Sequence, residues 1–391
     1  MTKAVSGKLL QFVYASNFFY GLHFALVVYV LSTYIASYIG ETYVGLVYAS
    51  IALISIFFSL NFFRLINWLG HRKLTLILFA VTILSSLALA FSSDAVTAII
   101  FVVIYSVAEF LLLIAFDLAV EKLSNDATTG NIRGVYLTMY NLAFVAGPLI
   151  TGSIIGNDSY PLMFVTAALI LLPSLAICIF GLKGLPEIKP RDHHLRDGLR
   201  VLNRNVNIRK IFISTFVLEF FYTWMTIYTP LYLHQYAGFA WSDIGFIFMI
   251  MLLPFVFFEL PLGVIADRYL GEQEILTAGF IIAAVSTAGL YFLGYTSIVP
   301  WAALLFLTRT GASAIEIMNE TYFFKQIGPR DAGVIAFFRN ARQFNYIVAP
   351  IVAIILLQIM PMQGLFLALG IVMLVGAYNA SSLQDTEPSR A

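Results

Sequence analysis

The sequence predicts an all-α integral membrane protein whose twelve transmembrane helices form two pseudo-symmetric six-helix bundles. Three observations lead to this prediction: an apolar composition, a series of long apolar runs, and a repeat that relates the two halves. Of the 391 residues, 60% are apolar and 11% are charged, and the mean hydropathy is +0.89. Soluble domains carry roughly 25% charged residues. The charged residues of this chain could cover only the ends of its helices, which excludes a soluble globular fold.

The apolar runs are long enough to cross a bilayer. A hydrocarbon core about 30 Å thick requires about 20 apolar residues in a helix. The predicted spans of the first half are residues 9–34, 44–63, 74–91, 95–120, 134–156 and 161–182. Those of the second half are residues 211–235, 241–266, 275–293, 299–323, 332–357 and 362–380. The first run exceeds a typical signal-peptide core and lacks a clear small-x-small cleavage site, so we predict a retained span.

The distribution of basic residues predicts the orientation. When the spans are numbered in turn, these basic residues fall on one side of the membrane: Lys3, Lys8, Arg72, Lys73, Lys122, Arg133, Arg268, Lys325 and Arg330. The loops on the opposite side contain acids such as Glu41, Asp94, Asp158 and Asp243. Because basic loops stay in the cytoplasm, we expect both termini to be cytoplasmic in a multi-pass protein of the cell membrane.

Residues 183–210 interrupt the apolar pattern and separate a predicted N-terminal bundle, residues 1–182, from a C-terminal bundle, residues 211–391. The segment carries the basic residues Lys189, Arg191, Arg196, Arg200, Arg204 and Arg209. Opposite them, Leu195, Leu199, Leu202 and Val206 recur at helical spacing. This pattern is typical of a basic amphipathic helix on the cytoplasmic membrane surface, with anionic lipid as its partner. Nucleic acid, the other partner of basic runs, does not suit a chain with so many spans.

The two halves repeat each other at an offset close to 200 residues. Asn17-Phe-Phe-Tyr20 in the first span returns as Glu219-Phe-Phe-Tyr222 in the seventh. At one common spacing, Asp117, Gly134, Val135 and Asn141 correspond to Glu316, Gly333, Val334 and Asn340. A nearly constant offset across several spans predicts two bundles related by an axis along the membrane normal.

The stretch GVIADRYLGE joins the predicted eighth and ninth spans. Its pattern Gly263-x-x-x-Asp267-Arg268-x-x-Gly271 resembles the loop signature of the major facilitator superfamily, which joins the second and third spans of each half. The second-half copy has one extra residue and Glu272 where a base is usual. The first-half counterpart, FRLINWLGHR, has Asn67 where the family has Asp. The resemblance implies a transporter whose two bundles surround a central cavity.

A signature of this kind suits an inner gate. We expect Asp267 to face the amino end of the eleventh span, where free N–H groups and the helix dipole favour an anion. Arg268 could then pair with an acid on a neighbouring helix, in a contact that holds one state of alternating access and breaks in the other. A short turn with surface charges is the alternative. The other residues that we assign to the gate are Asp117, Glu316, Arg339 and Arg342.

Polar groups at depth in a membrane are costly and therefore indicate function. By resemblance, the first, fourth, seventh and tenth spans line the cavity, so Asn17, His23, Glu109, Glu219 and Arg309 would face it. Glu219 and Arg309 lie near mid-bilayer and could meet. Competition among Arg309, a solute and a proton for the Glu219 carboxylate would couple transport to protons. The alternative for Glu219 and Arg309 is a purely structural ion pair. The alternative for His23 is a role in packing.

Aromatic residues crowd the first and seventh spans and could line a site for an amphipathic or aromatic solute. Tyr222 is the one that we assign to the substrate site. Packing against lipid or other helices explains the others equally well. They are Phe18, Phe19, Tyr20, Phe220, Phe221, Trp224 and Tyr228.

The stretch AGPLITG in the fifth span resembles the antiporter signature of the drug-efflux branch of this superfamily. Gly147 and Gly152 would allow close helix approach, and Pro148 would bend the helix. Thr151 stands where the signature has a glycine. Ordinary helix packing is the alternative, but the resemblance favours export in exchange for protons.

Taken as a whole, these features favour a secondary transporter for a small molecule, with protons as a second partner, working as a monomer. The sequence has no Gly-x-x-x-x-Gly-Lys loop to bind nucleotide phosphates. A single cysteine, Cys178, allows no thiolate cage, and the five histidines show no metal-ligand spacing beyond one adjacent pair, so we expect neither an enzyme nor a cofactor. Export is the leading prediction; a proton symporter or facilitator for nutrient uptake, or a receptor on the same fold, is the alternative.

Overall fold

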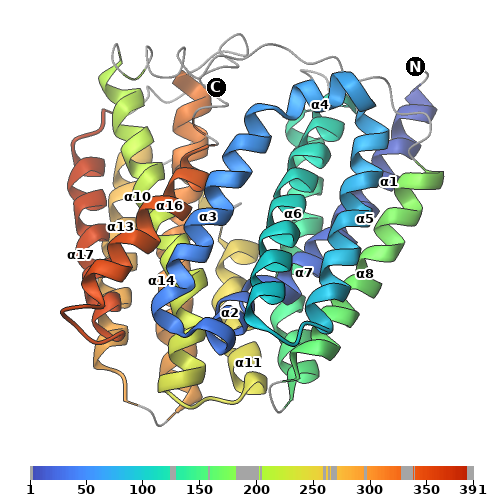
Figure 1. Cartoon of the computed structure of the whole chain (residues 1–391). Coiled ribbons are helices and arrows are strands. Elements are labelled where there is room, and N and C mark those ends of the chain that lie inside the picture. The colour runs from blue at the N-terminus through green and yellow to red at the C-terminus, as the bar shows by residue number, and fades with distance from the viewer. Residues whose placement is uncertain are drawn as a thin grey trace. The chain divides into compact units, whose positions relative to one another are not determined.

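The computed structural model describes the chain except for residues 1–2, 124–128, 157–158, 182–201, 203–204, 259–260, 263–264, 266–270, 295–296, 327–337, 339 and 385–391. The described residues are helical almost throughout and divide into two compact units (Figure 1). Unit 1 comprises Met1–Arg191 together with Ala240–Gly245, and unit 2 comprises Asp192–Phe239 together with Phe246–Ala391. The main division between them falls inside the segment 183–210.

Unit 1 contains six spans. Its helices are α1 (Lys3–Val28), α2 (Leu31–Ile39), α3 (Glu41–Leu60), α4 (Phe62–Leu69), α5 (His71–Ala90), α6 (Ala95–Leu123), α7 (Thr129–Ile155) and α8 (Tyr160–Phe180). The helices α1 and α2 form one apolar stretch, Leu9–Ile39, which is longer than the predicted first span. The short helix α4 occupies a segment that we expected to be a loop. Gly70, with a φ of 79°, ends it and allows the sharp entry into α5.

Unit 2 contains the other six spans. Its helices are α10 (Val206–Leu231) with the π-turn η1 (Tyr232–Tyr236), α11 (Trp241–Phe257), α13 (Glu272–Gly289) with the 3₁₀ turn η2 (Leu290–Phe292), α14 (Ile298–Gln326), α16 (Ala341–Leu356) and α17 (Gly364–Ser381). The first residues of α11 belong to unit 1. Across both units, ten described stretches are long and apolar enough to span a membrane, and α11 and α16 are shorter apolar helices. The twelve predicted spans are therefore present.

The helix α10 begins within the segment predicted to be the linker. Asn205 accepts hydrogen bonds from the backbone N–H groups of Asn207 and Ile208, at 3.0 and 3.2 Å. Such an N-cap satisfies donors that the helix cannot, so α10 begins at Val206 and the last residues of the predicted linker are its first turn. Most of the predicted amphipathic helix, residues 182–201 and 203–204, lies outside the described part of the chain.

Five helix pairs that pack together in unit 1 have counterparts that pack together in unit 2, as the sequence repeat predicts. In unit 1, α1 packs on α6, α7 and α8, and α5 packs on α6 and α8. In unit 2, α10 packs on α14, α16 and α17, and α13 packs on α14 and α17. Counted by span, these pairings are identical, which supports the pseudo-symmetry of the two bundles.

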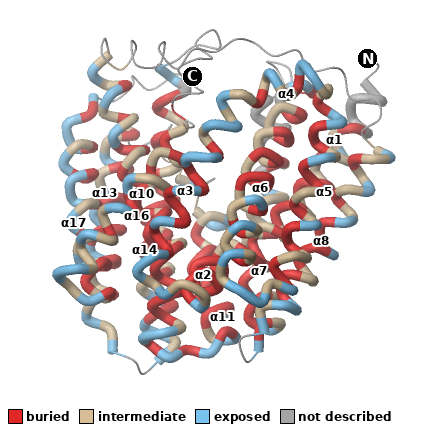
Figure 2. Tube along the Cα trace, in the orientation of Figure 1, coloured by how far each residue is buried: buried red, intermediate tan, exposed pale blue. Residues whose placement is uncertain are grey.

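Apolar side chains lie both inside and outside each bundle. Unit 1 has a core that includes Phe79, Leu112 and Phe116, and unit 2 buries Trp301 against Tyr232 and Phe366. The outer faces of helices such as α5 and α17 expose residues that are apolar in sequence (Figure 2). An apolar outer surface on apolar helices is expected where lipid is the solvent.

Asp94 stands immediately before α6 and caps it. Its carboxylate accepts hydrogen bonds from the Thr97 hydroxyl, at 2.6 Å, and from the Thr97 backbone N–H, at 2.9 Å. These donors, the hydroxyl first, lower the pKa of Asp94 below its ordinary value. The cap fixes the point at which the fourth span begins.

Candidate functional site

A seam of polar and charged side chains, buried or half-buried, lies in unit 2 where α10 packs on α14 and α16. On α14, Arg309, Glu316 and Glu320 are spaced by seven and four residues, which places them on one face of the helix. On α10, Glu219 and Tyr222 are three residues apart and share a face. We call Glu219, Tyr222, Arg309, Glu316, Glu320 and Arg342 the acidic cluster.

Tyr222 and Glu316 form the central hydrogen bond of the acidic cluster. The tyrosine hydroxyl donates to Oε2 of Glu316 at 2.6 Å, from α10 to α14. The sequence predicts Tyr222 in the substrate site and Glu316 in the gate, whereas this bond joins the two groups. The predicted separation of substrate site and gate is therefore not seen for these two residues, because the acidic face of α14 is turned toward Tyr222 on α10.

Glu219 has a different neighbour from the one expected. The described residues show no hydrogen bond or ion pair between Glu219 and Arg309, so the predicted pair is not formed. Glu219 instead interacts electrostatically with Arg342 on α16 and with the acids Glu316 and Glu320. Arg309 shares a face of α14 with the acids but lies seven residues, about 10 Å, along the helix from Glu316, where it contacts the ring of Tyr222. The base near Glu219 comes from the third helix, α16.

Arg309 is 2% exposed and lies against two rings of α10. Its guanidinium carbon is 5.1 Å from the ring centroid of Phe221 and 5.2 Å from that of Tyr222. These distances suit cation–π attraction. It also interacts electrostatically with Glu316.

Neutral polar contacts continue the seam. The Ser214 hydroxyl donates to Oδ1 of Asn319 at 2.7 Å, and the Asn345 amide donates to the Phe216 carbonyl at 3.1 Å. The Trp224 indole N–H donates to the Ala349 carbonyl at 2.6 Å. These bonds fix the rotation of α10 against α14 and α16, and so the direction in which Glu219 and Tyr222 point.

Unit 1 has a buried polar group built in a similar way. The Tyr20 hydroxyl on α1 donates to a carboxylate oxygen of Glu109 on α6. The Asn17 amide donates to the Tyr136 carbonyl on α7 at 2.8 Å, and its Oδ1 has no hydrogen-bond partner. Tyr20 is not among the site residues predicted from the sequence. Its place in the repeated Phe-Phe-Tyr motif, where it corresponds to Tyr222, could have indicated it.

His23 is fully buried and both of its ring nitrogens are engaged. Nδ1 lies 2.8 Å from the Ala167 carbonyl, and Nε2 lies 2.9 Å from the Tyr105 hydroxyl. The carbonyl can only accept, so Nδ1 carries the proton and Nε2 accepts from the tyrosine. This arrangement favours the packing role over the proton site for His23.

Gly147 and Gly152 of α7 lie where the chain has no room for a side chain. A methyl group on Gly147 would meet Cβ of Ala25 at 2.3 Å, and one on Gly152 would meet the Trp241 carbonyl at 2.5 Å. Pro148 lies between them in the helix interior. Thr151 adds a hydrogen bond of 2.9 Å to the Leu26 carbonyl. The stretch therefore packs α7 closely against α1 and against the first residues of α11.

Half of the predicted gate residues lie outside the described part of the chain. Gly263, Asp267, Arg268 and Arg339 are among the residues that the structure does not describe. Asp117 is half-buried in α6. Gly271 directly precedes α13 in an extended conformation, with φ −74° and ψ 169°.

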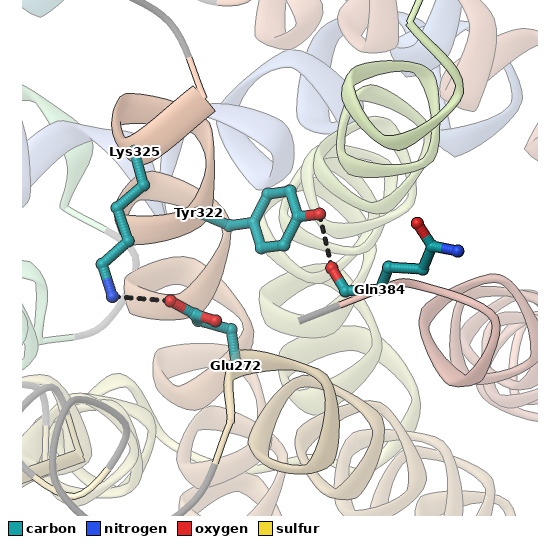
Figure 3. A network of polar contacts seen from close by, with 4 residues as sticks. All are labelled: Glu272, Tyr322, Lys325 and Gln384. Carbon is teal, nitrogen blue, oxygen red and sulfur yellow. Dashed lines mark hydrogen bonds and ion pairs between the residues drawn. The ribbon is translucent and has the colours of Figure 1, made fainter. Parts of the chain in front are cut away.

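An ion pair that was not predicted from the sequence lies next to this segment. Lys325 Nζ at the end of α14 is 2.7 Å from Oε1 of Glu272, whose side chain is 3% exposed (Figure 3). In the same view, the Tyr322 hydroxyl donates to the Gln384 carbonyl at 2.6 Å. Glu272 stands where the signature has a base, and a base from α14 faces it. Glu272 at the end of GVIADRYLGE, an acid where the signature has a base, is the feature of the sequence that could have indicated this ion pair.

Comparison with known proteins agrees with this architecture. The family model for the Major Facilitator Superfamily matches residues 13–349. No curated protein matched the chain. A mutant of the nucleoside transporter NupG is 14% identical, with a TM-score of 0.78 over 96% of this chain and 99% of that one. A bacterial homologue of the human lysosomal transporter Spinster, inward-facing and unoccupied, is 10% identical, with a TM-score of 0.75 over 97% of each chain.

At such low identity the solved structures establish the fold, while the family match extends over most of the sequence. Within the described residues, no group of three or more His, Cys, Asp or Glu side chains could hold a metal ion. The chain belongs to the major facilitator superfamily and is a multi-pass membrane transporter.

Proposed function

We propose that this protein is a secondary transporter that couples the movement of a small solute to protons by alternating access. The observation that carries the proposal is the acidic cluster of unit 2, with the Tyr222 to Glu316 hydrogen bond at its centre. Three carboxylates lie there with two arginines, on α10 and on the two helices that pack against it, α14 and α16.

The composition of the acidic cluster suits proton transfer. A carboxylate at depth in a membrane is stable only when it is paired, hydrogen-bonded or protonated. Arg342 near Glu219, and Tyr222 with Arg309 near Glu316, stabilise the ionised forms, whereas the third acid opposes them. A solute that displaces one of these contacts changes the proton affinity of a carboxylate, which is the linkage that coupling requires.

Two directions of transport follow from two different observations. The resemblance of AGPLITG to the antiporter signature favours export of the solute in exchange for protons, and we retain it as the first candidate. Uptake together with protons is the second candidate, because the buried guanidinium of Arg309 is suited to an anionic solute. The nucleosides named for one structural neighbour belong among the solutes to be tested in either direction.

The coupling proposal is tested in proteoliposomes that contain a trapped pH-sensitive dye. The solutes are nucleosides, amphipathic amines and small carboxylates, each applied with and without a proton gradient. We expect a solute-dependent proton flux whose sign gives the direction, and expect Glu219→Gln and Glu316→Gln each to abolish gradient-driven accumulation while downhill exchange continues. The exposed acid Glu274 at the start of α13 offers a control, Glu274→Gln, that leaves coupling intact.

If Glu219 has only a structural role, a different set of results is expected. Glu219→Gln would then lower protein yield and thermal stability, and the double variant with Arg342→Gln would regain both. Gradient-driven transport in that double variant would exclude Glu219 from coupling. Transport that ignores the proton gradient in the wild-type protein would overturn the proposal as a whole.

A further inference from the structure

Arg309 carries more hydrogen-bond donors than its surroundings can use. A guanidinium has five N–H donors and no acceptor. Arg309 is 2% exposed, its Nε has no partner, and no hydrogen bond of the described residues involves its side chain. Leaving a donor of a buried charged group without an acceptor destabilises the protein. The position near the middle of α14 makes the cost greater, because lipid offers no alternative acceptor.

The neighbours of Arg309 stabilise its charge without occupying its donors. The rings of Phe221 and Tyr222 lie 5.1 and 5.2 Å from the guanidinium carbon, and ring faces attract the cation but accept no conventional hydrogen bond. Glu316 is near enough to interact electrostatically, but it is not within ion-pair distance and its carboxylate accepts from Tyr222. Arg309 is therefore held in place with its donors unfilled.

We infer that Arg309 binds a carboxylate group of the transported solute. This inference rests on the proposed transport function and identifies the class of substrate. A guanidinium fork matches a carboxylate in a bidentate geometry, and the match is strongest where water is excluded. The rings of Phe221, Tyr222 and Phe255, with Tyr222 and Phe255 centroids 6.3 Å apart, would accommodate an apolar or aromatic body attached to that carboxylate.

The charges around Arg309 give the sign of coupling. Tyr222 and Glu316 interact with Arg309 directly, and these two interact in turn with Glu219 on α10, Glu320 on α14 and Arg342 on α16. With every acid ionised, three carboxylates already oppose two arginines. A solute carboxylate that takes Arg309 also removes its stabilising effect on Glu316, so the acidic cluster binds a proton when it binds the anion. Anion and proton then move together, as in the second candidate direction.

The test uses pairs of small molecules that differ in one group. Thermal unfolding of the purified full-length protein in detergent is measured with acetate, benzoate and phenylacetate, and with the neutral amides acetamide, benzamide and phenylacetamide. We expect at least one aromatic carboxylate to raise the melting temperature more than its amide. We also expect that carboxylate to withdraw protons from a weakly buffered solution. Arg309→Gln should weaken its binding on the order of 30-fold or more, as for other buried charge-assisted contacts.

Two further variants keep the inference testable if Arg309→Gln folds poorly. Arg309→Lys retains the charge without the planar fork and should bind the carboxylate weakly while still folding. Arg209→Gln, which removes an exposed arginine in the first turn of α10, should bind like the wild type. Equal stabilisation by amides and carboxylates, stabilisation by none of the three carboxylates, or unchanged binding in Arg309→Lys would each overturn the assignment.

These results separate the substrate class from the proposed coupling. If the protein transports neutral or cationic solutes with protons, the coupling proposal stands and the role of Arg309 fails. If carboxylates bind through Arg309 but flux ignores the proton gradient, the substrate class stands and the coupling proposal fails.

Discussion

Tyr222 Oη lies 2.6 Å from Oε2 of Glu316, and this hydrogen bond joins the first and fourth spans of unit 2. Tyr20 donates in the same way to Glu109 between the first and fourth spans of unit 1. The two tyrosines occupy the same place in the repeated Phe-Phe-Tyr motif, but their acceptors do not correspond. By the repeat, the counterpart of Glu316 is Asp117, which lies roughly 12 Å along α6 from Glu109 at 1.5 Å per residue. The pseudo-symmetric halves thus place their carboxylates at different depths.

Removal of the Tyr222 hydroxyl should weaken both stability and coupling. Tyr222→Phe keeps the ring beside Arg309 but leaves Glu316 without its donor, so we expect a loss of about 0.5–2 kcal/mol in the free energy of unfolding, the usual range for hydrogen bonds between membrane helices. A double-mutant cycle with Glu316→Gln, followed by thermal unfolding in detergent, measures the pairwise energy. Additive effects of the two substitutions would show that the bond contributes nothing.

Gly147 should tolerate no larger residue. An alanine there would place its methyl group 2.3 Å from Cβ of Ala25 and 2.9 Å from the backbone carbon of that residue, so α1 and α7 must separate. We expect Gly147→Ala to lower the melting temperature, at a cost of about 1–3 kcal/mol, as overpacking does elsewhere. Gly294 provides the matched control, because a methyl group added there would have no neighbouring atom within 4 Å. Gly294→Ala should therefore unfold like the wild type.

The stability that the ion pair of Lys325 and Glu272 contributes should depend on opposite charges at the two positions, and not on which helix, α13 or α14, carries the acid. Lys325→Ala leaves a carboxylate with a 3% exposed side chain facing no lysine, and we expect a loss of about 1–3 kcal/mol in the free energy of unfolding, the usual cost of a buried polar group that loses its hydrogen-bond partner. The exchanged double variant, Glu272→Lys with Lys325→Glu, should recover most of the stability. If each single variant is as stable as the wild type, the pair is only a surface contact.

The orientation of the chain is open to direct labelling. Ser93, between α5 and α6, and Gly294, between η2 and α14, are exposed in the structure. Because the basic loops predict a cytoplasmic location for both termini, single cysteines at these two positions should react with a membrane-impermeant maleimide added outside intact cells. The background is Cys178→Ala, which removes the one native thiol. Protection of both cysteines, with labelling only after the membrane is permeabilised, would reverse the topology.

The membrane class, the number of spans and the correspondence of the halves could be predicted from the order of residues alone. Span length and apolar composition are local properties, set by the thickness of the bilayer and by the need of each backbone to satisfy its own hydrogen bonds. The run predicted for residues 95–120 matches the apolar stretch of the structure, Ala95–Val120, for that reason. The constant offset of the repeat predicted which helices would pack alike, since equivalent sequences bury equivalent faces.

The partners of the buried polar side chains, in contrast, depend on how the helices pack. Each residue turns a helix by about 100°, so a small change in rotation or in shift along the axis exchanges one partner for another. That is why Glu219 lies near Arg342 instead of Arg309, and why Tyr20 and Tyr222 donate to acids that the repeat does not relate. Depth along a helix can be counted from the sequence, but the direction in which a side chain points depends on the helices packed around it.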